Sequence, residues 1–271
     1  MIYGAEIWGY EYSHQIEKIH NKYCRHILGV STQAPTCAVL GELGRLPMYI
    51  NYTTKCIKYW LRIQHMDTKR LPLQCYKMLY EYDGAGRTTW ASHIKRLLYQ
   101  MGFGHVWMNQ SVGDPDSFIH IFKQRLFDIN FQNWQQDVQS TAKLNHYANY
   151  KSELKLEKYL EFNISRYNKC ILTKLRCANL KLEIEHGRHL GLERHQRICK
   201  LCNQNTEDSY HFVMVCPKLE TVRNTYLKGL VKPTNLHTFQ NLMKCQKQKD
   251  VYNLTEFLRE AWKFRLDYLN A

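Results

Sequence analysis

Apolar residues recur at helical spacing in the first part of the chain. In the segment SHQIEKIHNKYCRHILGV, Ile16, Ile19, Tyr23 and Ile27 fall on one stripe, and Gly29 follows it. This spacing predicts an amphipathic helix that packs its apolar stripe against a core and ends at the glycine.

The same helix carries a basic face opposite its apolar stripe. Lys18, Lys22 and Arg25 lie on that face. Two interpretations stay open: a ridge that contacts phosphates, or an ordinary solvated surface.

Helical patterning continues through the middle of the chain. A short helix is predicted over 35–43 and a longer one after Pro47, where a missing N–H is harmless. The apolar stripe of the longer helix is Tyr49, Tyr52, Cys56, Tyr59 and Ile63. Several shorter helices are predicted between 71 and 151, and no long strand-like alternation occurs. The sequence therefore predicts a mainly α fold.

A further helical stripe precedes the most cysteine-rich segment. It consists of Ile171, Leu175, Ala178 and Leu182. Lys174 and Lys181 lie beside this stripe and are predicted to place their charges on nucleic-acid phosphates. After residue 187 the periodicity stops and basic residues follow closely, namely Arg188, Arg194 and Arg197. A last helix is predicted from a cap at Thr255, with an apolar face of Phe257, Leu258, Ala261 and Leu269.

The charge of the chain indicates the class of its partner. The 271 residues include 38 Lys and Arg against 24 Asp and Glu, a net charge of +14. Residues 151–200 hold twelve basic and six acidic side chains, whereas 71–150 hold seven and six. Such a local excess favours a polyanion, above all nucleic acid, over an ordinary basic surface. No small-molecule substrate is indicated.

Other features of the sequence exclude a membrane or export route. No stretch approaches eighteen uninterrupted apolar residues, so no membrane span is expected. The start MIYGAEIWGY lacks a basic region and a cleavage site, so we expect an intracellular protein, nuclear or cytoplasmic. Ten cysteines in such a compartment favour reduced thiols or a metal site over disulfides.

Three of the cysteines and one histidine have metal-ligand spacing. Cys199, Cys202, His211 and Cys216 form C-x2-C-x8-H-x4-C, which suits one structural zinc ion with no position left for water. Residues five apart lie about 140° apart on a straight α-helix, so Cys216 must lie where a helix ends and the chain bends. Thr206 is the expected cap of that helix, and Glu207 and Asp208 suit its positive N-terminus. The alternative is a chance coincidence of inert thiols.

Two blocks resemble a known family. LTKLR…LEIEHGRH…RICKLCNQNTEDSYHFVMVCPKLETVR is similar to the C-terminal region of non-LTR retrotransposon reverse transcriptases. YGAEIWG, IEKIHNKYCRHILGV and VLGELGRLPMYI resemble the part of that family just past the palm and into the thumb. The matched blocks cover about 2–66 and 166–223.

This resemblance implies a thumb-like helical segment over 1–70, a helical connector over 71–165, and a basic helix, zinc knuckle and C-terminal helix over 166–271. It implies that the four Cys and His residues above bind metal and that Arg188, Arg194 and Arg197 contact nucleic acid. The chain departs from the family because it has no adjacent Asp-Asp pair and its one Pro-Asp, at 115–116, lies upstream of the cysteines. Polymerase chemistry needs two metal ions held by such aspartates, so no catalytic residues and no enzyme activity are expected.

Two hypotheses of different class follow. The first is a catalytically incomplete protein that binds RNA or DNA through basic helices and a zinc knuckle. The alternative is a zinc-stabilised helical scaffold that binds protein, with its basic faces solvated. An enzyme and a relic without selected function are two further alternatives. The first hypothesis predicts binding that weakens with salt. The scaffold predicts weak nucleic-acid binding that charge reversal at Arg188 and Arg194 leaves unaffected.

Overall fold

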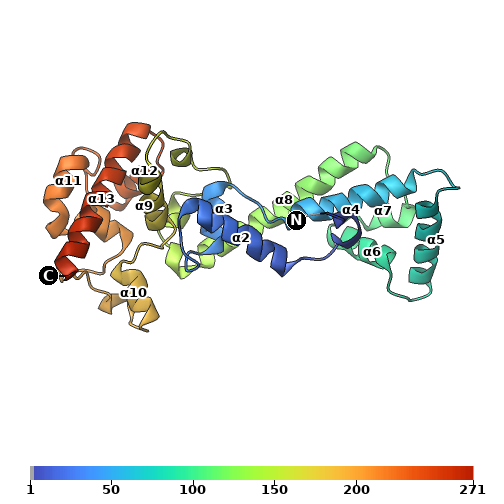
Figure 1. The fold of residues 1–271 in the computed structure, drawn as a ribbon, viewed down its shortest axis with the longest axis horizontal. Helices are drawn as coiled ribbons and strands as arrows, with labels where there is room; N and C mark the ends of the chain where they lie inside the picture. Colours follow the sequence, from blue (N-terminus) through green and yellow to red (C-terminus); the bar gives the residue numbers. More distant parts are fainter. Residues whose placement is uncertain (1–2, 271) are drawn as a thin grey trace. The chain divides into compact units, whose positions relative to one another are not determined.

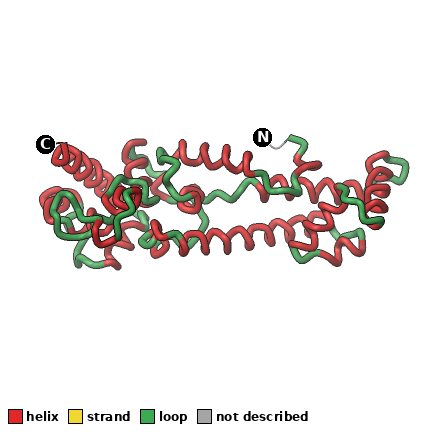
Figure 2. Tube along the Cα trace, turned by 90° about the horizontal axis from the view of Figure 1, so that it is seen from below, coloured by secondary structure: helices red, strands yellow, loops and turns green. Residues whose placement is uncertain are grey.

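The computed structural model describes residues 3–270, and it consists of helices joined by loops and turns (Figure 2). No β-strand forms among these residues, and one isolated antiparallel bridge pairs Ile198 with Thr206. The predicted mainly α fold is thus confirmed. The α-helices are α1 (Ala5–Trp8), α2 (His14–Leu28), α3 (Thr36–Leu43), α4 (Tyr49–Gln64), α5 (Leu71–Gly84), α6 (Trp90–Gln100), α7 (Gly104–Asn109), α8 (Pro115–Ser140), α9 (Arg166–Arg176), α10 (Glu183–His189), α11 (Glu220–Tyr226), α12 (Leu236–Met243) and α13 (Gln248–Asn270).

Short helical turns of other types complete the backbone. The 3-10 turns are η1 (Ala142–Leu144), η2 (Tyr147–Asn149), η3 (Lys158–Leu160), η4 (Arg194–Gln196) and η6 (Pro217–Leu219). A π-helical turn, η5, spans His211–Val215. Among the described helices none is long and apolar enough to cross a membrane.

The chain packs into two compact units, whose elements can be followed in Figure 1. Unit 1 comprises the residues up to 20 together with 46–133, and unit 2 comprises 21–45 together with the residues from 134 onward. The division falls within α2 and α8, so each of these helices contributes to both units. The division into three consecutive segments stays a prediction.

Unit 1 is built around α4. The predicted stripe of this helix is confirmed at Tyr52, Cys56 and Ile63, which are buried, while Tyr49 and Tyr59 are half-buried. Helix α1 packs on α4, and α5, α6 and α7 pack in succession. These apolar contacts form one continuous core, as expected when each helix buries a single stripe.

The predicted orientation of α2 is wrong. Ile19, Tyr23 and Ile27 are 53%, 55% and 39% exposed, while Glu17 and Cys24 on another side of the helix are buried. The cause is a polar contact, because Glu17 accepts hydrogen bonds from the backbone N–H groups of Met48 (3.2 Å) and Tyr49 (2.8 Å) at the start of α4. A carboxylate at a helix N-terminus satisfies donors that have no partner within the helix.

Unit 2 is built around α13, along which α9 and α11 pack (Figure 1). The core of this unit includes Leu172, Phe212 and Phe257, which are fully buried. Two helix bounds differ from prediction. Helix α9 ends at Arg176 because Ala178 adopts a left-handed conformation (φ 49°). Helix α13 begins at Gln248, well before Thr255, and its first turns bury Val251 and Leu254, which lie on the apolar face.

A buried arginine connects distant parts of the unit 2 core. Arg176 forms a bidentate ion pair with Glu42 (2.9 Å for both hydrogen bonds) and a second ion pair with Glu157 (2.8 Å). It also donates to the Met243 carbonyl, and its guanidinium lies 4.9 Å from the ring centre of Tyr150. This network joins α3, α9 and the end of α12 in a place where an unpaired charge would be costly.

The network predicts a large stability loss for Glu42→Gln. Removing one carboxylate leaves the buried Arg176 guanidinium only partly neutralised, which costs about 3–5 kcal/mol of unfolding free energy. Urea unfolding measures this loss. Glu153→Gln is the control, because that carboxylate is largely exposed, and its unfolding midpoint is expected to stay unchanged. Equal midpoints for both variants would contradict the assignment.

Candidate metal centre

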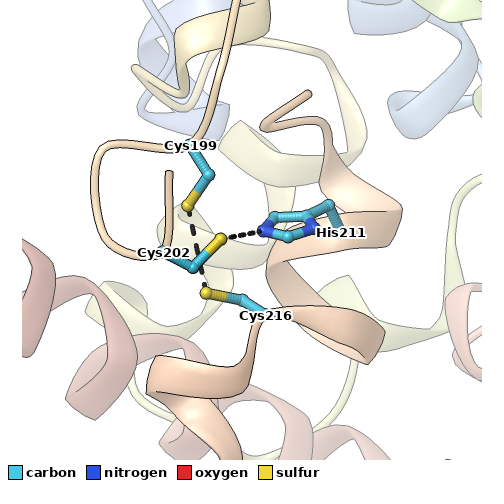
Figure 3. A group of neighbouring side chains, drawn as sticks. All are labelled: Cys199, Cys202, His211 and Cys216. Atoms are coloured by element: carbon cyan, nitrogen blue, oxygen red, sulfur yellow. Dashed lines mark hydrogen bonds between the residues drawn. The ribbon is translucent and has the colours of Figure 1, made fainter. Parts of the chain in front are cut away.

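Four side chains from two neighbouring segments converge in unit 2. The side chains of Cys199, Cys202, His211 and Cys216 point toward one another (Figure 3), and their ligand atoms all lie within 4.8 Å of one another. Cys199, His211 and Cys216 are buried, and Cys202 is half-buried. The predicted ligand set is therefore brought together, and it can hold a metal ion.

The distances suit a tetrahedral site. Cys199 Sγ lies 3.9 Å from Cys216 Sγ, and Cys202 Sγ lies 3.4 Å from His211 Nε2. Four ligands with metal–sulfur bonds of about 2.3 Å and a metal–nitrogen bond of about 2.0 Å would be separated by roughly 3.5–3.8 Å. With all four positions filled by protein, such a site has a structural role rather than a hydrolytic one.

The first two ligands lie on a tight turn. Cys199 N–H donates to the Asn205 carbonyl, and Asn203 N–H donates back to the Cys199 carbonyl, both at 2.8 Å. Asn203 adopts a left-handed conformation (φ 56°), which asparagine tolerates better than most residues. The antiparallel bridge between Ile198 and Thr206 closes this turn. The backbone of this turn thus places the thiols of Cys199 and Cys202 on the same side of the turn.

The second pair of ligands lies at the two ends of the π-helical turn. Cys216 N–H donates to the His211 carbonyl at 2.8 Å, a bond that spans five residues. The prediction that the i, i+5 spacing needs a departure from a straight α-helix is confirmed, and the departure is this widened turn followed by Pro217. The expected cap at Thr206 is wrong. Asp208 caps the turn instead, because its Oδ1 accepts the His211 N–H at 2.9 Å.

A buried arginine fixes the end of the π-helical turn. Arg223 Nε donates to the Val213 carbonyl (2.8 Å), and a terminal nitrogen donates to the Cys216 carbonyl (2.9 Å). Burial lowers the pKa of Arg223, while the neighbouring Cys216 opposes this shift. Carbonyls that the last turn leaves without helical partners are thereby satisfied.

A second buried arginine links the turn of Cys199 to the C-terminal helix. Arg265 on α13 donates to both carboxylate oxygens of Glu207 (2.8 and 2.7 Å) and to Glu183 (3.1 Å). Glu207 in turn lies 3.7 Å from Cys199 Sγ and accepts the Glu183 N–H at 2.8 Å. Burial alone would lower the pKa of Arg265, but its bonds to Glu207 raise it. The guanidinium therefore offsets negative charge beside the thiols.

The thiols of Cys199 and Cys216 have different pKa values. The hydrogen bond with Cys216 and burial raise the pKa of Cys199 to about 12, whereas the same bond lowers the pKa of Cys216. Thiolates rather than thiols bind metal ions, so binding of an ion by these two residues would release protons.

Two of the eight predicted nucleic-acid contacts are engaged inside the protein. Arg25 donates to the Ala34 carbonyl (3.2 Å) and to Thr36 Oγ1 (2.7 Å). Arg197 donates to the carbonyls of Ile184 and Leu192, at 3.1 Å and at 2.6 and 3.0 Å. Both guanidiniums thus stabilise loops.

The other predicted contacts lie at the surface to different degrees. Lys18, Lys22 and Lys181 are exposed, and Lys174 is half-buried. Arg188 and Arg194 are partly exposed and face carboxylates, with nitrogen–oxygen distances of 3.7 Å to Glu185 and 3.2 Å to Asp208. In unit 2, Arg188 and Arg194 line a hollow together with Asp208 of the metal segment, which we define as residues 197–223. Lys181 lines a second hollow that shares Ala178 and Glu185 with the first.

Sequence patterns missed the two supporting arginines. Arg223 and Arg265 stand among other charged residues, and their spacing gives no indication of burial. Glu207 was expected only to favour a helix N-terminus. The one available indication for Arg265 was its position four residues after Ala261, on the apolar side of the last helix.

The cluster predicts one bound divalent ion per chain. Cys216→Ser removes one thiolate and should weaken metal binding strongly and reduce the thiolate absorption, because only three protein ligands remain. Cobalt(II) titration, read by its thiolate charge-transfer absorption, checks this. Cys75→Ser is the control, since Cys75 is an exposed thiol in unit 1, and it should bind as the parent chain does.

The link between Arg265 and Glu207 predicts a weaker metal site for Arg265→Gln. The variant leaves a buried carboxylate uncompensated beside Cys199, so metal affinity should fall about 10- to 100-fold. Arg259→Gln removes an exposed arginine of the same helix and should leave the affinity unchanged. Competition with a chelator measures the metal affinity of both variants. Equal affinities would contradict the proposal that Arg265 stabilises the metal site.

Comparison with known proteins gives no relative: no family model, no curated protein and no solved structure matches this chain.

Proposed function

We propose that this chain is a nucleic-acid-binding protein without catalytic activity, whose unit 2 is stabilised by one structural zinc ion. The observation that carries this proposal is the four-ligand cluster together with Arg188 and Arg194, which line a hollow with Asp208 of the metal segment. The resemblance to the C-terminal part of non-LTR retrotransposon reverse transcriptases points to the same function, with RNA or DNA as the partner.

The donor set supports zinc as the ion. Three thiolates and one imidazole are soft and borderline ligands, which select against magnesium and calcium. Zinc has no redox chemistry and accepts a tetrahedral arrangement without preference for another geometry. Cys199 and Cys202 come from one turn and His211 and Cys216 from the next, so an ion would cross-link the two halves of the metal segment. Its binding free energy then adds to folding free energy.

The surface charge supports a polyanionic partner. The net charge of the whole chain is +14, and exposed basic residues at or beside the metal segment include Arg194, Lys200 and Lys218. Ion pairs neutralise only part of this positive charge, because Arg194 and Arg188 each face one carboxylate. Lys181 faces no carboxylate in the described part of the chain. Phosphates of RNA or DNA match such a surface by releasing counterions.

An apolar groove favours a second candidate function, a zinc-stabilised scaffold that binds protein. The groove of about 460 Å³ lies in unit 2, and its lining includes Ile27, Leu156, Leu160 and Ile164. Ile27 and Leu156 are 39% and 46% exposed. Exposed apolar side chains around a groove are typical of protein contacts.

The proposed function predicts zinc-dependent, salt-sensitive binding. The purified chain should contain one zinc and bind labelled single-stranded RNA or duplex DNA. For single-stranded RNA, the logarithm of its affinity should fall by about 0.7 per contacted phosphate for each tenfold rise in salt. Cys202→Ser should lose zinc and binding together. Cys75→Ser serves as the control, since this exposed thiol lies outside the cluster.

Two other results would contradict this function. Affinity that does not change with salt would exclude phosphate contacts as its source. One zinc per chain without nucleic-acid binding would instead support the protein-binding scaffold.

A further inference from the structure

Two adjoining hollows form a cleft on unit 2 beside the metal segment. The outer hollow measures about 220 Å³ and the inner one about 40 Å³, and both are lined by Lys143, Ala178 and Glu185. The inner hollow alone has room for about three water-sized spheres. The cleft is thus large enough for a small polar group with its hydration.

Hydrogen bonds fix the backbone of the residues that line both hollows. Ala178, with its left-handed backbone (φ 49°), contributes to both hollows. The next residue, Asn179, accepts the Ser31 N–H and donates to Ser31 Oγ, both at 2.8 Å. A non-glycine residue in this conformation is uncommon and costs free energy, so its surroundings must fix it.

Two exposed donors of the cleft have no partner among the described residues, and a third faces a single carboxylate. Lys181 and His189 line the outer hollow, are exposed, and form no hydrogen bond or ion pair with the described residues. Arg188 lines the inner hollow, and its buried Nε makes no hydrogen bond within the described chain but lies 3.7 Å from Glu185. The carboxylate of Glu185 is already paired with Lys143 at 3.1 Å. An incoming anion would therefore meet donors rather than uncompensated negative charge.

The metal segment forms one wall of the same cleft. Asp208 lines the inner hollow, accepts the N–H of the metal ligand His211, and faces Arg194 and His146, each at 3.2 Å. Folding of the metal turn thus places Arg194 at the cleft.

We propose that this cleft, rather than the metal-binding turn itself, holds a backbone phosphate of the bound nucleic acid. The inference rests on the proposed function and assigns the contact to Lys181, Arg188 and His189. Lysine supplies a point charge, and arginine supplies fixed N–H donors, which are the two common partners of phosphate oxygens. In this arrangement the metal ion would stabilise the residues beside the cleft and would not contact the nucleic acid.

Lysine footprinting tests the contact directly in the full chain. The zinc-loaded protein is acetylated with and without saturating single-stranded RNA, and each lysine is quantified by mass spectrometry. Lys181 should be protected by RNA. Lys228, an exposed lysine of unit 2 outside both hollows, should react equally in both samples.

A pair of double variants tests the energetics. Lys181→Gln with His189→Gln should weaken RNA binding several-fold at low salt and reduce the salt slope by about 1, with zinc content unchanged. The matched control, Lys228→Gln with His237→Gln, changes one exposed lysine and one exposed histidine elsewhere in unit 2 and should match the parent chain.

The results distinguish a wrong assignment of the phosphate site from a wrong proposed function. RNA binding by the parent chain, with Lys181 unprotected and equal slopes for both double variants, would overturn the cleft while leaving the proposed function intact. An absence of salt-sensitive binding in the zinc-loaded parent chain would overturn both.

Discussion

Confinement of four ligand atoms within 4.8 Å is the constraint on which the metal segment of unit 2 depends. A straight α-helix would separate His211 from Cys216, and the π-helical turn removes that separation at the expense of regular hydrogen bonding. The protein compensates with side chains, since Asp208 caps the start of the turn and Arg223 satisfies carbonyls at its end. The geometry of the ligands and the pattern of buried polar contacts thus have one cause.

Buried arginines carry the coupling between this segment and the rest of unit 2. Arg265 ties Glu207, beside Cys199, to the C-terminal helix, while Arg176 ties α3 to α9 through Glu42. Ion pairs of this kind are costly to break, because either partner alone would remain buried and charged. They also show that a high count of basic residues overstates the positive surface. Arg25 and Arg197 were expected at phosphates, yet both bind backbone carbonyls.

The sequence contained enough information for the ligands and for most helices, and too little for their orientation. The spacing from Cys199 to Cys216 is a local pattern tied to one chemistry, so it identified the cluster directly. Helix α3 and the end of α2 likewise follow from local glycine and proline positions. The exposed stripe at Tyr23 could not be predicted, because it depends on Glu17 meeting the start of α4 some thirty residues away. The buried pairs of Arg176 and Arg265 escaped prediction for the same reason, since their partners lie far away in the chain.

The most direct test of the central claim is zinc K-edge X-ray absorption of the zinc-loaded chain. The account predicts three sulfur ligands at about 2.3 Å and one nitrogen ligand at about 2.0–2.1 Å, with no oxygen ligand. A coordination shell dominated by oxygen or nitrogen, or one with fewer than three sulfurs, would contradict a closed site formed by Cys199, Cys202, His211 and Cys216.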